Sequence, residues 1–282
     1  MSGAVNGGWY LLHQAVTGCG KAFCQDHHVA FTAAGGRAAV LAVADGHGSA
    51  PHFRSDLGAR WAAEEFAACA RCFVRRAEGG PGANDKPASL PTLRALAREL
   101  PRQLVRGWRQ RVALHEANAP AHGRRPETPA FDVYGTTLLG AVITGELLVC
   151  WQLGDGDIVL VDTAGRTDTP LDAGPDLGDE TESLCLPEAW LRARLHWQPL
   201  TGGPPPAVLL STDGLSKSFT DRGGFLAFAR GVRERAGQEG PDQVQGKLAD
   251  WLGHAATHSG DDTTLVGAIP VSPAGSDEGQ QQ

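Results

Sequence analysis

Five short acidic islands are spread over almost the whole chain, and they constrain how it can fold. They are Gln25-Asp26, Asp45-Gly46-His47-Gly48, Gly154-Asp155-Gly156-Asp157, Ser211-Thr212-Asp213-Gly214 and Gly260-Asp261-Asp262. Four of them lie directly before or after an apolar run that is typical of a strand. Strand ends from distant parts of a sequence can meet at one edge of a sheet, where several carboxylates can bind divalent cations. The pattern predicts a fold in which these aspartates converge.

Length and charge narrow the class of protein. The 282 residues suffice for one large domain, and no internal boundary is evident. With 25 basic and 32 acidic residues the net charge is -7, which argues against partners such as nucleic acid or an anionic membrane surface. No apolar run reaches the roughly 18 to 20 residues that span a bilayer, and the N-terminus lacks a signal-peptide pattern. We therefore expect a cytoplasmic protein.

The cysteines fit a reduced protein interior. Cys24 and Cys150 fall in apolar segments, and Cys69 and Cys72 fall in a segment with helical periodicity, so we expect buried thiols. Cys69 and Cys72 also form a C-x-x-C pair, which leaves a zinc or redox site open as an alternative. No second cysteine pair or histidine pair has the spacing of a zinc finger.

Periodicity predicts three strands and then two long helices in the first half of the chain. Residues 9–16, 27–33 and 37–44 are apolar or mixed runs separated by glycine-containing turns. Helical spacing begins after Ser49, with Ser49 or Ser55 as a candidate cap. The apolar stripe of this helix would be Phe53, Leu57, Trp61, Ala68 and Cys72. The stripe of the second helix would be Leu93, Leu96, Leu100, Leu104, Trp108 and Val112, with Pro101 as a candidate kink.

The second half alternates between strands, an irregular segment and helices. Residues 135–162 predict two or three antiparallel strands, and residues 166–206 are rich in proline and glycine and are expected to form an irregular insertion. The remaining expected elements are a strand at 207–211, helices at 222–236 and 241–257, and a strand at 263–269. Loops are expected at 78–90 and 119–132, and a disordered tail at 272–282. This order indicates an α+β fold with helices packed on antiparallel sheets.

The islands carry residues that suit chemistry with hard cations. The apolar run 40–44 ends at Asp45, and the glycines that follow allow a carboxylate and a main-chain carbonyl to approach one ligand. Asp213 repeats this arrangement, whereas Asp261 starts a strand that must run in the opposite direction for the carboxylates to meet. Asp155 and Asp26 can also be read as ordinary turn residues.

A carboxylate-rich set without a histidine or cysteine cluster favours Mg²⁺ or Mn²⁺ over zinc. Two such ions about 3.5 to 4 Å apart can lower the pKa of a bridging water and produce hydroxide near neutral pH. Attack on a phosphate ester then benefits from an acid that protonates the departing alkoxide. His47, two residues after Asp45, is placed for this role, although it can also be read as a turn histidine that bonds a neighbour.

In this order the islands resemble the metal-dependent protein serine/threonine phosphatases of the protein phosphatase 2C type, as found in bacteria. The similarity covers about residues 9–270. It rests on Val-Ala-Asp-Gly-His-Gly at 43–48, Gly-Thr-Thr at 135–137, Gly-Asp at 154–155, Ser-Thr-Asp-Gly at 211–214 and Asp-Asp-x-Thr at 261–264. The resemblance implies a four-layer α-β-β-α sandwich of two antiparallel sheets with a metal cleft at one edge. It implies one phosphatase domain over 1–271, with 166–206 as a variable flap beside the cleft.

The resemblance also implies roles for individual residues. Asp45 would bridge two metal ions, the Gly46 carbonyl would bind one of them, and Asp213 and Asp261 would hold the other. Asp155 matches a ligand of a third ion, shared with Asp213.

Two positions near the N-terminus depart from the family pattern. Gln25-Asp26 replaces a more acidic pair that contacts metal through water, so one carboxylate becomes a neutral amide. Lys21 stands where the family has a phosphate-binding arginine, and a lysine cannot form the bidentate fork.

The activity that the resemblance implies is hydrolysis of phosphoserine and phosphothreonine in proteins through a metal-bridging water or hydroxide. Two or three Mg²⁺ or Mn²⁺ ions would be bound, and the enzyme, expected to be a monomer, would counteract a serine/threonine kinase. A non-catalytic member of the fold that binds a signalling partner is the alternative, and a phosphatase of small molecules also stays open. An aspartyl-phosphate enzyme is disfavoured because Asp45-Gly46-His47 lacks the second carboxylate of an Asp-x-Asp motif.

Overall fold

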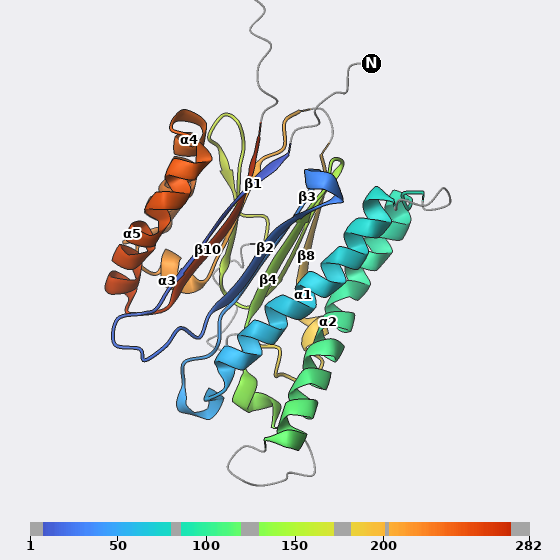
Figure 1. Cartoon of the computed structure of the whole chain (residues 1–282), viewed down its shortest axis with the longest axis vertical. Coiled ribbons are helices and arrows are strands. Elements are labelled where there is room, and N and C mark those ends of the chain that lie inside the picture. Colours follow the sequence, from blue (N-terminus) through green and yellow to red (C-terminus); the bar gives the residue numbers. More distant parts are fainter. Residues whose placement is uncertain (1–7, 80–85, 120–129, 172–181, 201–202, 272–282) are drawn as a thin grey trace, which may run out of the picture.

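Two antiparallel sheets form the centre of the molecule (Figure 1). The computed structural model describes residues 8–79, 86–119, 130–171, 182–200 and 203–271. In strand order, the first sheet contains β1 (Trp9–Val16), β10 (Thr263–Pro270), β9 (Ala207–Ser211), β6 (Asp157–Val161) and β7 (Thr167–Asp168). The second contains β2 (His27–Ala33), β3 (Ala38–Ala44), β4 (Leu138–Ile143), β5 (Leu147–Leu153) and β8 (Arg194–Pro199).

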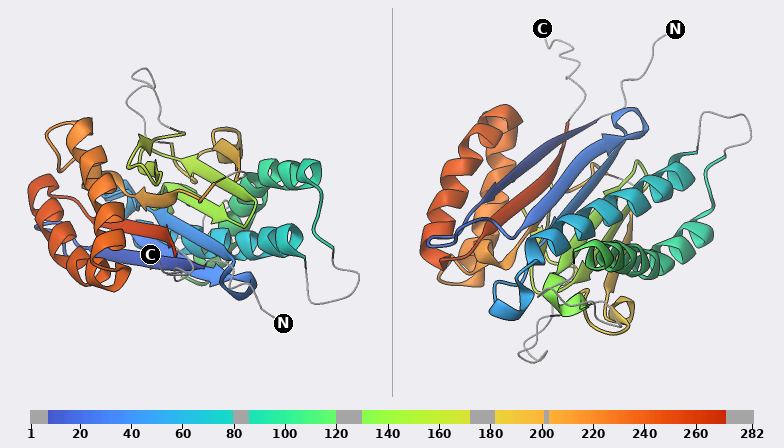
Figure 2. Two further views of the ribbon diagram at one scale, coloured as in Figure 1. Left: turned by 90° about the horizontal axis from the view of Figure 1, so that it is seen from above. Right: turned by 60° about the horizontal axis from the view of Figure 1, so that its bottom comes forward.

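A pair of helices covers the outer face of each sheet (Figure 2). The helices α1 (Ser55–Glu78) and α2 (Leu90–Asn118) pack on the second sheet, and α4 (Arg222–Gln238) and α5 (Pro241–Ser259) pack on the first. The short helix α3 (Asp213–Ser216) follows β9. None of the helices described is both long and apolar enough to cross a membrane. The layers follow the order helix, sheet, sheet, helix, as expected.

Three apolar layers hold the sandwich together. On β3 successive side chains alternate, so that Leu41 and Val43 face the other sheet while Val40 and Ala42 face the helices. Because both faces of the sheet are covered, β3, β4 and β5 are buried at every position, which explains their continuous apolar sequences. The layer between the sheets brings β3 and β10 together. β3 ends just before Asp45, and β10 begins just after Asp262.

The first helix differs from its prediction in both start and face. It begins at Ser55, and neither Ser49 nor Ser55 caps it with a side-chain hydrogen bond. Leu57 and Trp61 are half-buried and pack against the core, as expected. Phe53 precedes the helix, and Ala68 and Cys72 are exposed, so the predicted stripe is confirmed only in part. The buried face consists of Ser55, Gly58, Ala59, Ala62, Ala63, Phe66, Ala67, Ala70, Phe73 and Val74. Small residues lie on several sides of the helix, so the sequence pattern fits more than one buried face. The face that packs on the sheet is the one rich in alanine and glycine, which allows close contact.

The expectation of buried cysteines is confirmed only in part. Cys150 is buried, Cys24 and Cys69 are half-buried, and Cys72 is exposed. Cys150 belongs to β5, whose two faces are both covered, whereas Cys72 lies on the solvent side of α1.

The middle of the chain departs from its prediction in two ways. Although β4 and β5 form the expected antiparallel pair, β6 belongs to the other sheet, so the turn at 154–157 carries the chain from one sheet to the other. The segment expected to be irregular contains β8, which pairs with β5 from Leu147↔Pro199 to Gln152↔Arg194. Leu195 and Trp197 of β8 pack on the core at period two. Residues 172–181 of the insertion, 80–85 and 120–129 of the two expected loops, and the tail 272–282 lie outside the described residues.

Candidate metal and phosphate site

The Asp45 turn is fixed by the chain that leads into β4. The Asp45 carbonyl accepts hydrogen bonds from the Thr137 amide and the Thr136 hydroxyl, both at 2.9 Å. The Asp45 amide donates to the Thr137 hydroxyl at 3.1 Å, and Gly46 forms an isolated β-bridge with Thr136. Two separate motifs, Asp-Gly-His-Gly and Gly-Thr-Thr, therefore form one local structure. It holds the Asp45 side chain at the end of β3.

Gly46 is required by close backbone contacts. A Cβ atom at this position would lie 2.7 Å from the Gln25 carbonyl oxygen and 2.8 Å from that of Ser55. Any side chain would push apart the segment before β2, the Asp45 turn and the start of α1. The glycine was predicted to allow close approach to a ligand, and the structure shows that it also lets three segments of the chain pack together.

Asp213 follows β9 and Asp261 precedes β10, two adjacent antiparallel strands, as their order in the sequence required. Ser211 of β9 pairs with Leu265 of β10, so the end of β9 meets the start of β10. Asp213 is buried and begins α3, directly after β9. A Cβ atom on Gly214 would overlap the Asp262 carbonyl oxygen, so this junction also needs glycine.

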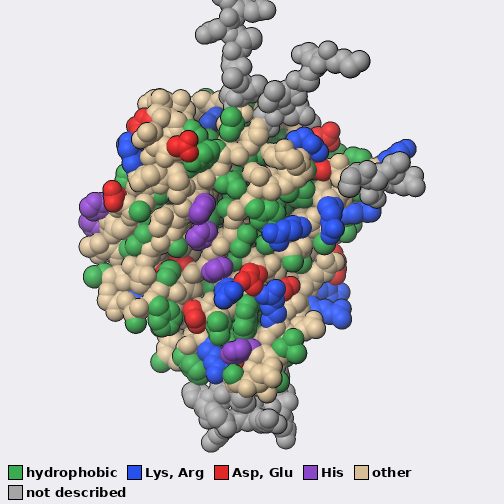
Figure 3. Space-filling model, viewed as in Figure 1, with side chains coloured by type: hydrophobic (Ala, Val, Ile, Leu, Met, Phe, Trp, Pro, Cys, Tyr) green, Lys and Arg blue, Asp and Glu red, His purple; other side chains and the backbone are tan. Residues whose placement is uncertain are grey.

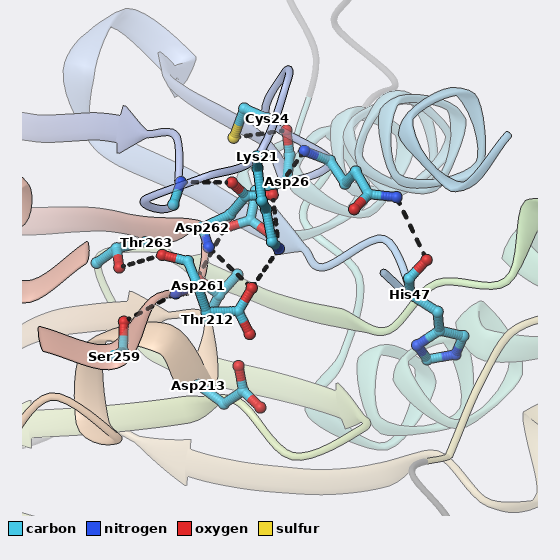
Figure 4. A network of polar contacts seen from close by, with 12 residues as sticks. Lys21, Cys24, Asp26, His47, Thr212, Asp213, Ser259, Asp261, Asp262 and Thr263 are labelled. Carbon is cyan, nitrogen blue, oxygen red and sulfur yellow. Dashed lines mark hydrogen bonds and ion pairs between the residues drawn. The ribbon is translucent and has the colours of Figure 1, made fainter. Parts of the chain in front are cut away.

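Asp26 joins the two sheets at this edge. It lies just before β2, yet its Oδ2 accepts a hydrogen bond at 2.8 Å from the Thr212 hydroxyl at the other sheet's edge (Figure 4). The Thr264 hydroxyl, from the same edge, donates to this oxygen at 2.8 Å as well. Its Oδ1 is buried and has no hydrogen-bond partner among the described residues. Burial raises the pKa of Asp26 to about 7, against the lowering effect of the two hydroxyls. The sequence did not reveal the two threonines as partners.

Lys21 lies against the carboxylates that precede β10. Its Nζ bonds to Asp261 and lies 3.2 Å from Asp262 Oδ2 (Figure 4). Burial lowers the pKa of Lys21, but the hydrogen bond to Asp261 and the nearby negative charges outweigh this and raise it above its usual value. Asp262, buried, also accepts from the amides of Gly18 and Gln25 at 2.8 Å each. It thereby holds the loop between β1 and β2, a role not assigned from the sequence.

The Gln25 side chain is used within the protein. Its amide nitrogen donates to the Ser55 hydroxyl at 2.7 Å and to the His47 carbonyl at 3.3 Å. Gln25 therefore ties the Asp45 turn to the start of α1. A glutamate at this position could not donate these hydrogen bonds, which gives a structural reason for the amide.

His47 lies beside the site and is held largely neutral. Its amide donates to the Gly135 carbonyl at 3.1 Å, and its ring centroid is 4.9 Å from that of His52. Burial, followed by the charge of His52, lowers the pKa of His47 to about 4. Protonation of a leaving group requires the imidazolium form, and a phosphate dianion bound next to the ring would favour that form.

The carboxylates of all five islands come together at one edge of the sandwich. Burial raises the pKa of Asp45 well above its usual value, and the negative charges of Asp26, Asp213, Asp261 and Asp155 raise it further. Asp213 Oδ1 is buried without a hydrogen-bond partner in the described part of the chain. Such crowded, incompletely bonded oxygens fit hard divalent cations, which would relieve the repulsion.

Two lysines already neutralise part of this charge. Lys21 forms an ion pair with Asp261. Lys217 follows Asp213 by four residues and forms an ion pair with its Oδ2. Within the described residues, no three His, Cys, Asp or Glu side chains stand as a ready-made ligand set. Cation binding would therefore require small movements of these side chains. Lys217 was not foreseen, although its spacing from Asp213 suits a helical ion pair.

Asp157 has a structural role outside the carboxylate site. It is buried at the start of β6 and forms an ion pair with Arg222 of α4. This contact links the first sheet to its covering helix, and it supplies a reason for a residue to which the sequence had assigned none.

Comparison with known proteins agrees with this geometry. The family model described as protein phosphatase 2C matches residues 20–253. No curated protein sequence matches the chain significantly.

Several solved structures share the fold at low sequence identity. A bacterial serine phosphatase has a TM-score of 0.60 at 15% identity, with 95% of this chain and 99% of that chain covered. The catalytic domain of the phosphatase PstP, in complex with two manganese ions, has a TM-score of 0.56 at 17% identity, with coverage of 95% and 100%. Stp1 from Staphylococcus aureus has a TM-score of 0.55 at 14% identity, with coverage of 94% and 96%. The family match confirms the resemblance seen in the motifs: the chain belongs to the protein phosphatase 2C family of metal-dependent protein serine/threonine phosphatases.

Proposed function

We propose that the chain hydrolyses phosphoserine and phosphothreonine in proteins, in a reaction that depends on Mg²⁺ or Mn²⁺. The observation that carries this proposal is the convergence of Asp45, Asp213 and Asp261, with Asp26 and Asp155 beside them, at one edge of the sandwich. Family membership and the manganese ions of the PstP structure support the choice of ion. We propose that residues 1–271 form one phosphatase domain, with 166–206 as its flap.

We assign one group of residues to binding the metal ions and another to binding the substrate. Asp45, the Gly46 carbonyl, Asp213 and Asp261 would hold two ions, and Asp155 would share a third with Asp213. When bound, the ions polarise the phosphate and make a water molecule acidic enough to act as the nucleophile. The Gln25 amide nitrogen is used by protein partners, whereas the buried Asp26 Oδ1 has no hydrogen-bond partner among the described residues. Of the two residues expected to act through water, we therefore favour Asp26.

Lys21 and His47 would act on the substrate. The Lys21 ammonium can move from Asp261 to a phosphate oxygen once a cation neutralises Asp261, because both contacts are ionic. His47 would donate a proton to the departing serine or threonine oxygen. The cell would use this activity to counteract a serine/threonine kinase, and we propose that the enzyme works in the cytoplasm as a monomer.

A non-catalytic binding role is the second candidate, and one observation favours it. Lys21 pairs with Asp261 and Lys217 pairs with Asp213, so these carboxylates are partly neutralised without metal. In that case the cleft would recognise a partner and would not turn over a substrate. The same lysines can also be displaced by divalent cations, so metal binding separates the two candidates.

The test is phosphate release from a phosphoserine peptide and a phosphothreonine peptide at increasing Mn²⁺, with calorimetric titration of Mn²⁺ in parallel. Asp213→Asn is expected to abolish release and weaken Mn²⁺ binding, whereas Asp250→Asn, on the exposed side of α5, should match the unmodified protein. Thermal unfolding checks that both variants fold. Peptide binding without any metal-dependent release would overturn the catalytic proposal. Release only from small phosphate esters would instead indicate a small-molecule phosphatase.

A further inference from the structure

Two histidines from different sheets face each other where strands β1 and β2 meet. His13 Nδ1 and His28 Nε2 are 3.4 Å apart, and the ring centroids are 5.4 Å apart. β1 is an edge strand of the first sheet and β2 an edge strand of the second, so the pair spans the edge of the sandwich. In Figure 3 histidine side chains gather near the middle of this face. The pair lies outside the set of residues proposed for catalysis.

The backbone on both sides of the pair is held firmly. His13 pairs with Val266 of β10, and Gln245 of α5 accepts from the His13 amide and donates to its carbonyl, at 3.0 Å each. His28 pairs with Val43 of β3. The two Cα positions are therefore set by strand pairing and by a side-chain clamp. The imidazoles are brought together by the fold, and only their side-chain rotations remain to be adjusted.

The separation of the two nitrogens matches two ligands of one tetrahedral zinc ion. With zinc to nitrogen bonds of about 2.0–2.1 Å and tetrahedral angles, two ligating nitrogens lie about 3.3–3.4 Å apart. A square-planar ion with similar bonds would need about 2.9 Å. Hydrogen bonds from nitrogen usually have heavy-atom distances of about 2.7–3.2 Å, so the 3.4 Å separation is long for an imidazole to imidazole bond.

We propose that His13 Nδ1 and His28 Nε2 bind a Zn²⁺ ion that bridges the two sheets. In the described part of the chain no third His, Cys, Asp or Glu side chain completes the set, so water would fill the remaining positions. His27 points to the opposite face of β2, because successive side chains on a strand alternate, and it does not serve as a ligand. Imidazole ligands favour zinc, whereas the carboxylate site favours Mg²⁺ or Mn²⁺, so the two sites are chemically distinct.

The site would restrain the loop between the two strands that it joins. Residues 17–26 connect β1 to β2 and carry Lys21 and Asp26. A zinc ion between His13 and His28 would fix the two imidazoles and add a direct link between the two strands at which this loop begins and ends. It would also stabilise the folded state, since the two ligands are far apart in the unfolded chain.

The test uses the full chain with Mg²⁺ in large excess, so that the carboxylate site is occupied by the ion it prefers. Zinc is titrated by calorimetry, and the ring nitrogens of the histidines are followed in long-range ¹H–¹⁵N spectra. We expect zinc to shift the His13 Nδ1 and His28 Nε2 signals and to raise the melting temperature. His13→Gln and His28→Gln should each weaken zinc binding by about tenfold or more, because one ligand of a chelating pair is lost. His254→Gln, on the exposed side of α5, is the matched control and should bind zinc as the unmodified protein does.

Equal zinc affinity in the unmodified protein and in either variant of the pair would overturn the proposal. Zinc binding that leaves both ring signals unshifted would also overturn it, by placing the ion at the carboxylates. Because His13 is exposed, His13→Gln is expected to fold even if His28→Gln does not, and it then decides the question. Neither result bears on phosphatase activity, which is measured without zinc.

Discussion

The charge on Asp26 gives the sharpest test of the site's electrostatics. Asp26→Asn removes the charge but keeps an oxygen that can accept from the hydroxyls of Thr212 and Thr264. In the absence of metal, the buried carboxylate is costly because it has one oxygen without a partner in the described structure and other aspartates nearby. We therefore expect the asparagine variant to be more stable than the unmodified protein when metal is absent.

The size of the effect follows from the raised pKa. Burial raises the pKa of Asp26 from 3.8 to about 7, and this difference corresponds to about 4 kcal/mol. Since Asp45 competes for protons in the same site, we expect about 2–4 kcal/mol. The folded state holds a proton that the unfolded state has lost between these two pKa values, so the unfolding free energy falls as pH rises through this window. Above the folded pKa the full cost is present.

The assay is urea unfolding in EDTA at several values between about pH 5 and about pH 8. Asp26→Asn should be more stable than the unmodified protein by about 2–4 kcal/mol at the upper end, and the gain should shrink at the lower end. With Mn²⁺ the difference in unfolding free energy between the two proteins should become smaller or change sign, because a cation stabilises the Asp26 carboxylate of the unmodified protein. Asp250→Asn, which removes an exposed charge, is the control for net charge. A gain that is absent at high pH, or that does not depend on pH, would refute the view that Asp26 is a buried charge.

Further predictions concern the substrate and the packing. Lys21→Arg should raise kcat/KM on a phosphopeptide because arginine forms a bidentate fork, and an unchanged value would show that Lys21 does not contact phosphate. His47→Gln should lower kcat by about 10²- to 10⁴-fold on phosphoserine peptides and much less on aryl phosphates, and equal losses would exclude the acid role. Gly58→Ala should lower the unfolding free energy by about 1–3 kcal/mol in urea, since the new Cβ overlaps the Tyr134 carbonyl oxygen. Gly253→Ala, where no atom lies within 4 Å, should instead stabilise its helix.

The convergence of the acidic islands could be predicted because it depends only on chain order and strand direction. Asp213 ends one strand and Asp261 precedes another, and an antiparallel pair is the arrangement that brings them together. The partners inside the site could not be predicted in this way. Nothing in the local sequence tells which of Asp261 and Asp262 is free to bind a cation. In the structure, Asp262 accepts hydrogen bonds from two backbone amides of the loop before β2.

The errors in the fold prediction arose where a local pattern allowed two structures. In α1 the abundance of alanine supports more than one buried face, and contact with the sheet decides between them. The turn at 154–157 has the composition of a hairpin, but β6 pairs with β9 because that pairing extends the other sheet. Leu195 and Trp197 alternate with polar residues as a strand requires, yet the run is short and lies next to proline-rich sequence. In each case a long-range contact overrides the local signal.

The two sheets are joined across this edge by polar groups as well as by the apolar core between them. Asp26, next to β2, accepts hydrogen bonds from two threonines at the edge of the other sheet. In the loop that carries Asp26, the Gln25 amide donates a hydrogen bond to Asp262, which precedes β10. Divalent cations shared between Asp45 of one sheet and Asp213 of the other would add a third link of the same kind. If these links act together, the metal-induced rise in melting temperature should be smaller in Asp26→Asn than in the unmodified protein, even though Asp45 and Asp213 are unchanged. An equal rise in both proteins would show that the Asp26 link and the cation site act independently.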